Sequence, residues 1–506
     1  MDYGDILFDA AHAHPESVAM WYLDEVWSYS RLASAADHLG AQLYRCGVRP
    51  GTRVALCVGN EPAWVISFFA LARLRVSVVM VSTAWRGHEL RHCLETTRPS
   101  AVIATADSLA RLDESRWPDL CVVVGDSTAN GRWTTFDSLL AAAPAPEVPW
   151  SRSARADDEL ALPFSSGTTG LPKAVLHTHG SLTVATRQWR SALDVGPADR
   201  LQAVTPLSHI LGIVNVGATF LGGAAIRLFP RFGVAEMVDG IERDRTTIGI
   251  TVAPIASALT AMPALESRDL SSLRYLNWSA TPINADIARE FTHRTGVAWQ
   301  PAYGSTEVPI LAVSPVDRLD QSRLYSVGRA ADAVEVEAMD PDSTTVLPRG
   351  STGELVARSP ARMAGYLPES TPSPFTADGW YRTGDLGSVD ADGWIVISGR
   401  LKELIKVSGY QVSPVEIETV LSRSPDVADC AVVGIPDERR GEIPCAVVVR
   451  AAGSSADERS LIEWLAPELA RYKRLGHVVF VDEIPRSASG KILRRRLTET
   501  VSGRSS

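Results

Sequence analysis

The sequence predicts an α/β protein of two domains, and three observations lead to this fold class. A chain of 506 residues is too long for one hydrophobic core. Helical and strand-like periodicities alternate along residues 1–150 and again along 201–330, which is typical of βαβ units in a mainly parallel, helix-covered sheet. The pattern then restarts after the charged stretch 399–402. We therefore expect a large N-terminal domain over 1–399 and a small, mobile α+β domain over 400–506.

The first elements follow from the spacing of apolar residues. An amphipathic pattern predicts a helix over 31–46, and a strand-like run follows at 53–58. A second helical pattern over 63–74 leads to an apolar strand over 76–81. Together these segments form a βαβ rhythm, which favours parallel strands.

The second half of the large domain contains two kinds of segment. Residues 222–226 lead into a strand, and 247–252 form another. Between 325 and 400 the chain is rich in Gly, Asp and short β-branched runs. This composition predicts an antiparallel, turn-rich β subdomain within the large domain.

The small domain has a pattern of its own. We expect a helix beginning at Val415, strands over 431–434 and 445–449, and a helix over 458–470. The polar tail after Leu497 is expected to be disordered.

Composition excludes several classes of function. The formal net charge of −9 does not indicate the basic surface that binds nucleic acid, and it disfavours an anionic membrane as partner. No run of 18 uninterrupted apolar residues predicts a membrane span, and no signal-type apolar core follows the acidic start. Six scattered cysteines form no C-x-x-C pair, so we expect a reducing, cytoplasmic location.

The stretch Ser165 to Lys173 is the strongest candidate for a phosphate site. It holds four hydroxyls, two glycines and one lysine between two apolar runs, so we expect a loop joining two strands. Glycines let backbone N–H groups approach a ligand closely, and a lysine supplies a point charge for phosphate. A flexible surface loop has the same composition, and the Walker pattern is not met.

Three further stretches are candidate binding sites, but each is weak evidence when it is taken alone. Tyr303 to Glu307 combines an aromatic ring with a carboxylate that could hold Mg²⁺. Tyr381 to Asp385 places a carboxylate at a turn, where it could accept hydrogen bonds from ribose hydroxyls. Lys491 ends a loop of small residues ahead of the charged run 494–496. Ordinary turns and a solvated face are the alternatives.

A different class of function is suggested by His88-Glu89-Leu90-Arg91-His92. These residues match the pattern H-E-x-x-H of zinc proteases, so a zinc-dependent hydrolase using His88, Glu89 and His92 is an alternative. No third ligand follows in the extended form of the pattern, and we favour a surface helix.

Taken together and in order, these stretches resemble the adenylate-forming superfamily of acyl-CoA synthetases, non-ribosomal peptide adenylation domains and luciferases. The resemblance runs from about residue 5 to 497 and is most similar to ligases of the 4-coumarate:CoA type. The motifs that carry it are Ser165–Lys173, Tyr303–Glu307, Tyr381–Asp385, Gly399–Lys402 and Ser489–Lys491, supported by Pro206–His209, Gly353–Leu355, Gly434–Glu438 and Gly441–Glu442.

The resemblance implies a ligation in two steps at one site. A carboxylate attacks the α-phosphate of MgATP to give acyl-AMP and pyrophosphate, and the thiol of coenzyme A then displaces AMP. The implied cofactors are ATP, Mg²⁺ and coenzyme A, and the implied partner is a small carboxylic acid. An acyl-AMP ligase that loads a carrier protein is the alternative, and a homodimer stays open.

The resemblance also implies roles for single residues. Lys491 would bridge the carboxylate and the α-phosphate, and Glu307 would bind Mg²⁺. Asp385 would bind the ribose with help from Arg400, and Tyr303 would stack on adenine. The implied catalytic residues are Lys491, Glu307, Thr168, Lys406 and His209. The implied nucleotide-binding residues are Ser165, Ser166, Gly167, Thr168, Thr169, Gly170, Lys173, Ser279, Ala280, Thr281, Tyr303, Gly304, Ser305, Thr306, Asp385, Arg400 and Gln411.

The hinge and the acyl pocket complete the implied site. Lys402 matches the position about which the small domain turns. The pocket for the acid would be lined by His209, Ile210, Ile213, Ala302, Val308 and Pro309. Ile210 stands where amino-acid-activating relatives have an Asp, and a buried ammonium without a counter-charge is costly, so we expect an apolar acid that is aromatic, alicyclic or fatty. Thr281 and Ala302 depart from the usual motifs and predict an altered pocket floor.

Overall fold

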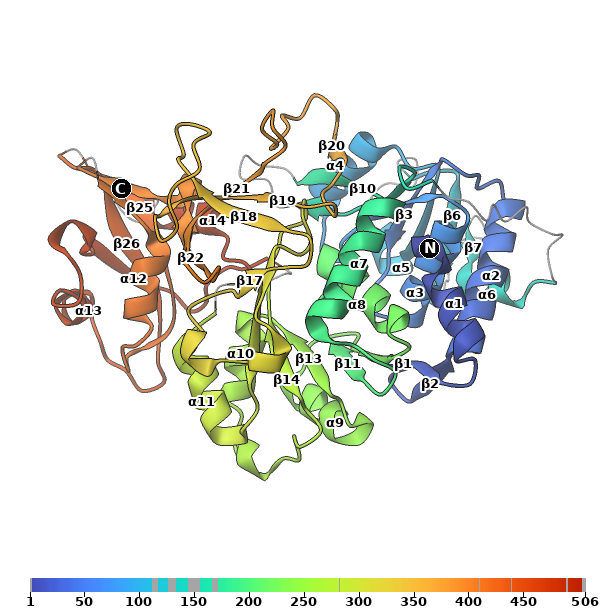
Figure 1. Cartoon of the computed structure of the whole chain (residues 1–506), viewed down its shortest axis with the longest axis horizontal. Coiled ribbons are helices and arrows are strands. Elements are labelled where there is room, and N and C mark those ends of the chain that lie inside the picture. The colour runs from blue at the N-terminus through green and yellow to red at the C-terminus, as the bar shows by residue number, and fades with distance from the viewer. Residues whose placement is uncertain are drawn as a thin grey trace.

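The computed structural model describes residues 2–111, 117–125, 133–143, 155–165, 172–281, 283–408, 410–437, 439–487 and 490–502. It has a large N-terminal and a small C-terminal domain, and four β-sheets with helices between and around them. Figure 1 shows the small domain, orange to red, at one end of the large one. The predicted α/β fold class is confirmed.

The first sheet has nine strands in the order β17-β16-β15-β14-β13-β11-β12-β1-β2. The strands from β15 to β1 run parallel, and antiparallel strands close both edges. Their bounds are β1 (Val18–Tyr22), β2 (Glu25–Ser28), β11 (Arg200–Ala203), β12 (Ala225–Leu228), β13 (Ile248–Thr251), β14 (Tyr275–Trp278), β15 (Trp299–Tyr303), β16 (Ala312–Val313) and β17 (Arg329–Ala330).

The second sheet also has nine strands, ordered β20-β10-β8-β4-β3-β5-β6-β7, with β9 paired to β10. It is parallel from β8 to β7 and antiparallel at β9, β10 and β20. The bounds are β3 (Arg53–Cys57), β4 (Ser77–Met80), β5 (Ala101–Thr105), β6 (Leu120–Val124), β7 (Thr134–Thr135), β8 (Glu159–Leu162), β9 (Phe164–Ser165), β10 (Lys173–Thr178) and β20 (Gly365–Leu367).

Helices pack between the two sheets and on their outer faces. The apolar helices α3 (Pro62–Arg73) and α8 (Ile210–Leu221) are buried almost throughout, and α7 (His179–Leu193) packs against α8. One large core therefore joins both sheets. The other helices are α1 (Ile6–Ala13), α2 (Tyr29–Arg45), α4 (Gly87–Thr97), α5 (Ala106–Leu109), α6 (Phe136–Ala141), α9 (Val234–Asp244), α10 (Ala253–Thr260) and α11 (Ala285–Thr295). The helices and strands predicted between 31 and 81 are confirmed.

The third sheet is antiparallel, as the turn-rich composition predicted. Its four strands follow the order β18-β19-β21-β22, with bounds β18 (Glu335–Met339), β19 (Gly353–Arg358), β21 (Tyr381–Val389) and β22 (Ile395–Arg400). A short 3₁₀ turn, η6 (Leu401–Glu403), leads from β22 to the small domain.

The small domain has its own hydrophobic clusters and a five-stranded sheet. Its elements are β23 (Ile405–Val407), β24 (Tyr410–Val412), α12 (Pro414–Leu421), β25 (Val427–Asp437), β26 (Gly441–Arg450), α13 (Glu458–Leu465), β27 (His477–Phe480) and α14 (Arg494–Ser502).

Two predictions for the small domain were wrong. The helix expected over 458–470 ends at Leu465. The tail expected to be disordered after Leu497 is helical through Ser502, because Leu497 and Val501 bury their side chains in a cluster that includes Ile484. A short polar segment can be ordered by two apolar contacts that its composition does not reveal.

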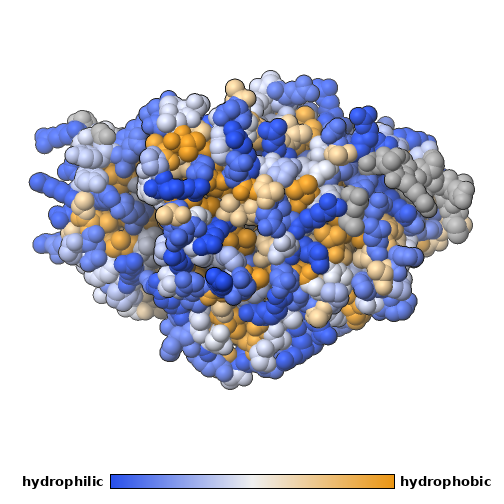
Figure 2. All heavy atoms as spheres, viewed as in Figure 1, coloured by the Kyte–Doolittle hydropathy of each residue, from blue (hydrophilic) through white to orange (hydrophobic). Residues whose placement is uncertain are grey.

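The surface carries the charged side chains that the composition indicates. Figure 2 shows hydrophilic residues over most of one face, with hydrophobic ones scattered between them. Within the described part of the chain, no helix combines the length and the apolar character needed to cross a membrane.

Candidate functional site

The predicted motifs lie where parallel strands of the first sheet end. The loops after β11, β14 and β15 contain His209, Ser279 and Glu307 respectively, and β13 leads directly into α10, whose first turn contains Pro254. Because these strands are parallel and adjacent, their carboxyl ends lie along one edge of the sheet. Open α/β sheets bind ligands at this edge.

The predicted phosphate loop joins two strands as expected. Ser165 at the end of β9 pairs antiparallel with Lys173 at the start of β10. The predicted ligands Ser166, Gly167, Thr168, Thr169 and Gly170 lie outside the described residues.

Glu307 is held at both carboxylate oxygens by phenol groups. The hydroxyl of Tyr366 donates to Oε1 at 2.9 Å, and that of Tyr381 donates to Oε2 at 3.3 Å. Burial and the charge of Glu307 raise the pKa of both phenols, so both remain donors at neutral pH. Lys173 Nζ lies 5.0 Å from the centre of the Tyr366 ring, so the start of β10 lies beside a phenol that binds Glu307.

Asp385 occupies a second buried position. Tyr303 donates its hydroxyl to Oδ2 at 2.6 Å, and Arg400 Nε lies 2.8 Å from Oδ1. Burial, and then the negative charge of Asp385, raises the pKa of Tyr303 well above its usual value. Carboxylate oxygens have about four lone-pair positions, so Asp385 retains capacity for two hydroxyls of a ligand.

Asp385 lies within β21, paired with Arg400 of β22, and not at a turn as predicted, and Glu354 fixes the residues just before it. Glu354 Oε1 accepts the N–H of Gly384 at 3.0 Å, and Oε2 accepts Arg382 Nε at 2.6 Å. Thr383 donates to the carbonyl of Leu355 at 2.6 Å. These bonds define the position of Asp385 relative to the third sheet.

The Ser279–Thr281 loop uses its side chains mainly for its own structure. Thr281 Oγ1 accepts the N–H of Ala253 at 2.8 Å and lies 3.2 Å from Trp278 Nε1. Ser279 donates to Asn277 Oδ1 at 2.8 Å. The positions predicted along the edge of adenine therefore offer chiefly their backbone groups to a ligand.

Gly304 allows a close approach within the next loop. A Cβ at this position would lie 1.9 Å from the carbonyl oxygen of Pro309. The chain thus folds back directly on Gly304, and the Ser305 side chain accepts the N–H of Val308 at 3.0 Å. A larger residue would displace the segment that carries Glu307.

Lys491 of the small domain reaches this group of charges. The preceding residue, Gly490, packs against the end of β13, where its Cβ would lie 3.2 Å from Pro254 Cδ. Burial, and then the charge of Arg400, lowers the pKa of Lys491. Asp385, Glu307 and Glu403 oppose this shift.

His209 is neutral and lies within the electrostatic influence of Lys491. Burial, followed by the Lys491 charge, lowers its pKa to about 4. Its Nδ1 accepts the N–H of Leu211 at 3.3 Å and so caps α8. In a neutral imidazole Nε2 then carries the proton, which makes His209 a donor.

The remaining predicted residues are placed as follows. Lys406 and Gln411 lie directly opposite each other on β23 and β24, and both are exposed. Lys402 is exposed in η6. The predicted acyl-pocket residues Ile210, Ile213, Ala302, Val308 and Pro309 are buried behind the sheet edge.

Sequence reasoning missed two functional positions. Tyr366 contacts Glu307 from 59 residues further along the chain, and Glu354 holds the turn before Asp385 from 30 residues away. The motif Gly353-Glu354-Leu355 was recognisable, but a role in positioning Asp385 was not. For Tyr366 no local pattern in the sequence marks the contact.

The H-E-x-x-H residues lie on α4, away from any metal-type cluster. Glu89 accepts the N–H of Arg86, and His92 Nε2 lies 2.9 Å from the carbonyl oxygen of Pro172. Across the ranges that the structure describes, no three His, Cys, Asp or Glu side chains form a group able to hold a metal. His88 is exposed to solvent.

A site at the edge of a sheet in a large α/β domain, with a lysine supplied by a small domain, is typical of an adenylate-forming enzyme. The profile of the AMP-binding enzyme family matches residues 7–367, and that of its C-terminal domain matches residues 416–491. The chain belongs to this family and is an AMP-forming ligase.

Relatives agree with this assignment. The chain is 35% identical over 490 residues to 4-coumarate–CoA ligase 1 of Oryza sativa subsp. japonica, covering 93% of this chain and 87% of that protein. It is 34% identical over 488 residues to the indoleacetate–CoA ligase of Aromatoleum aromaticum, covering 95% and 94%.

A solved structure is similar over the full length. The anthranilate CoA ligase AuaEII, in complex with anthranoyl-AMP, superposes with a TM-score of 0.92 at 27% identity, covering 100% of this chain and 98% of that one. Such a score over both domains indicates that their relative orientation is also similar.

The position of His88 leads to a test of the zinc hypothesis. We expect His88→Ala to retain full activity with Mg²⁺ as the added metal, because His88 is exposed and belongs to no group of three metal-type side chains within the described residues. Elemental analysis of the purified protein checks the same point. Stoichiometric zinc, or loss of activity on chelation of transition metals, would favour the hydrolase.

Proposed function

We propose that this protein is an AMP-forming acyl-CoA synthetase for an apolar carboxylic acid. In the first step a carboxylate oxygen bonds to the α-phosphorus of ATP, and the bond to pyrophosphate breaks. In the second step the thiol sulfur of coenzyme A, having lost its proton, bonds to the acyl carbon, and AMP leaves. The observation that carries the proposal is the placement of Lys491 among the charges of the large domain.

The first step needs positive charge because two anions must meet. Lys491 would lie between the carboxylate and the α-phosphate and stabilise the charge that builds up there. Lys173 would bind the terminal phosphates at the start of β10. His209, neutral and donating through Nε2, would orient the acid beside Lys491.

Nucleotide binding would divide between the two acidic residues. Asp385 would accept the ribose hydroxyls, with Tyr303 placed beside it for the adenine ring. Glu307 suits a hard cation, since Mg²⁺ prefers carboxylate oxygens and the two phenols orient this carboxylate without neutralising it. Bound there, Mg²⁺ would offset phosphate charge.

The acid would enter an apolar pocket. Ile210, Ile213 and Val308 are buried and uncharged, which suits a hydrophobic group and disfavours an amino acid. The relatives named above act on 4-coumarate, indoleacetate and anthranilate, which are all aromatic acids. Within the range of aromatic, alicyclic and fatty acids, we propose an aromatic one.

Coenzyme A is the proposed acceptor, as in those relatives. A carrier protein is the second candidate, because both acceptors present the same type of thiol. The small domain would turn about Lys402 between the two steps, since Lys491 lies close to Asp385 and Glu307 in the present orientation and the thiol would need a path to the acyl carbon.

A substrate screen tests the proposed function. ATP–pyrophosphate exchange is measured over a panel of aromatic, alicyclic and fatty acids, and thioester formation is measured with and without coenzyme A. We expect exchange with one or a few aromatic acids and thioester only with coenzyme A. Exchange without a thioester product would favour the carrier protein, and no exchange with any acid would refute the ligase assignment.

We expect Lys491→Ala to lower acyl-AMP formation at least about 10²-fold, by analogy with the loss of a single charge-stabilising donor. The measurement is ATP–pyrophosphate exchange on protein whose circular dichroism is unchanged. Lys473→Ala is the matched control, because Lys473 belongs to the same domain but pairs with Glu416. Exchange within threefold of the wild type would remove Lys491 from its proposed role.

We expect Lys402→Pro to retain pyrophosphate exchange within roughly tenfold and to slow thioester formation far more. Lys402 is the middle residue of η6, and 3₁₀ turns have φ values near the −65° that proline imposes. Proline should therefore tolerate this orientation and penalise one that needs another φ. An equal loss in both steps would place the pivot elsewhere.

A further inference from the structure

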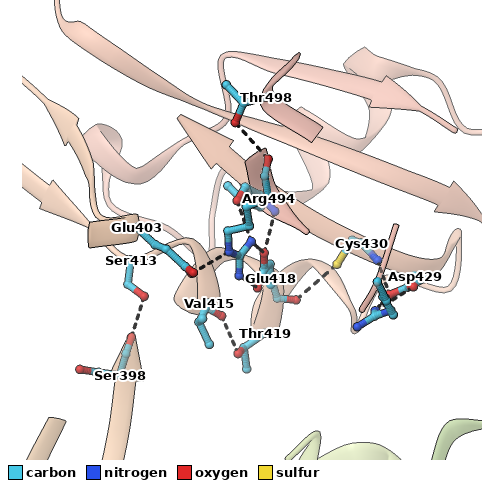
Figure 3. Close-up of polar contacts among 12 residues, drawn as sticks. Ser398, Glu403, Ser413, Val415, Glu418, Thr419, Asp429, Cys430, Arg494 and Thr498 are labelled. Atoms are coloured by element: carbon cyan, nitrogen blue, oxygen red, sulfur yellow. Dashed lines mark hydrogen bonds and ion pairs between the residues drawn. The ribbon is translucent and has the colours of Figure 1, made fainter. Parts of the chain in front are cut away.

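A hydrogen bond crosses the segment that joins the two domains. Ser413 donates its hydroxyl to the carbonyl oxygen of Ser398 at 2.6 Å (Figure 3). Ser398 belongs to β22 of the large domain, and Ser413 is the N-cap residue of α12 in the small domain. Lys402 lies between them in the chain. The bond therefore depends on the angle between the domains.

The two backbones are close together at this point. A Cβ on Gly399 would lie 2.6 Å from Ser413 Oγ and 3.3 Å from Ser413 Cβ. Only a residue without a side chain lets the start of α12 approach β22 so closely. The hydrogen bond lies at the surface, but the two backbones around it are closely packed.

The other end of α12 is tied to the lysine loop. Glu418 Oε2 accepts Arg494 Nη2 at 3.0 Å, and Glu418 Oε1 accepts the N–H of Val432 at 2.7 Å. Arg494 also donates to Glu403 Oε2 at 2.8 Å and to the carbonyl of Val432 at 2.9 Å. Figure 3 shows Arg494 between Glu403 and Glu418.

Arg494 stands three positions after Lys491, so these bonds connect the lysine loop rigidly to α12. The guanidinium is largely buried and its donors are taken by two carboxylates and a carbonyl, an arrangement that is costly to break at one partner. All these partners follow Lys402 and move with the small domain. By contrast, the Ser413–Ser398 bond joins the small domain to the large one.

We propose that Ser413 is a positioning residue for Lys491, which holds the small domain in the orientation used for acyl-AMP formation. The link runs from the Ser398 carbonyl through Ser413, α12, Glu418 and Arg494 to the lysine loop. Rotation about Lys402 breaks only its first bond. The proposal rests on the proposed two-step function.

The size of the effect follows from a two-state argument. If one orientation supports acyl-AMP formation and the other thioester formation, the ratio of the two rates is proportional to the ratio of the two populations. One ordinary hydrogen bond changes such a ratio about fivefold. A variant that merely unfolds some of the protein lowers both rates equally and leaves their ratio unchanged.

The main test uses Ser413→Ala. Pyrophosphate exchange is measured with an acid from the screen, and thioester formation is measured separately from the synthetic adenylate of that acid and coenzyme A. We expect the ratio of the two rates to fall about fivefold, with thioester formation undiminished. An unchanged ratio would overturn the proposal.

Thr419→Ala is the matched control. Thr419 is on the same helix, but its hydroxyl donates to Val415 within that helix at 2.7 Å. We expect its rate ratio to equal that of the wild type. Gly399→Ala is a second variant, in which the added Cβ pushes Ser413 away, and we expect the same direction of change as for Ser413→Ala.

The orientation of the two domains can also be measured directly, without a carboxylic acid substrate. Spin labels are placed on the full chain at Glu290 and Arg459, which are exposed on the large and small domains, with the exposed Cys46 replaced by serine. Distances are measured with ATP and Mg²⁺ in the wild-type and Ser413→Ala backgrounds. We expect the population of the present orientation, relative to the others, to fall about fivefold.

The rate ratio and the distance populations together distinguish an error in the proposed function from an error in the role proposed for Ser413. If no acid supports exchange but the distance populations shift, the proposed function is wrong and Ser413 still sets the orientation. If exchange occurs and neither the populations nor the rate ratio change, the function stands and Ser413 has no positioning role.

Discussion

The ammonium group of Lys491 lies among charged side chains, most of which come from the other domain, and much of the structure serves this placement. The edge of the first sheet supplies the surface on which Gly490 packs. Arg400 and burial destabilise the ammonium, whereas Asp385, Glu307 and Glu403 stabilise it. A lysine in such a position binds anions strongly, because its charge is only partly compensated and partly removed from water.

The acidic residues of the site are held by neutral or compensating donors. Glu307 receives two phenol hydroxyls, and Asp385 receives a phenol hydroxyl and a guanidinium. Their orientation is thus fixed before a nucleotide or a cation arrives, which lowers the entropic cost of binding. Glu307 follows the end of β15 and Asp385 lies within β21, so two different sheets contribute to one site.

The segment that joins the two domains is short. Between β22 and β23 lies only the 3₁₀ turn η6 with Leu404, whereas the Arg494 cluster makes the small domain rigid behind it. A rigid body on a short connector can take up distinct orientations at the cost of a few dihedral angles. Few contacts are then needed to choose between those orientations, and the Ser413–Ser398 bond is placed to be one of them.

The sequence by itself determined the helices and strands between 31 and 81, the pairing of strands around Ser165 and Lys173, and the family, since periodicity and motifs report local burial and local chemistry. It failed at the tail, because the burial of Leu497 and Val501 depends on the neighbouring strands β25 and β26 and not on composition. Only the tertiary structure decided which side chains contact Glu307 and which hold the residues before Asp385. It also decided that two glutamates bind Arg494 and that Ser413 contacts Ser398 between the two domains. These contacts join residues far apart in the chain, so they depend on the order of strands in the sheets and on the orientation of one domain against the other, which local patterns do not encode.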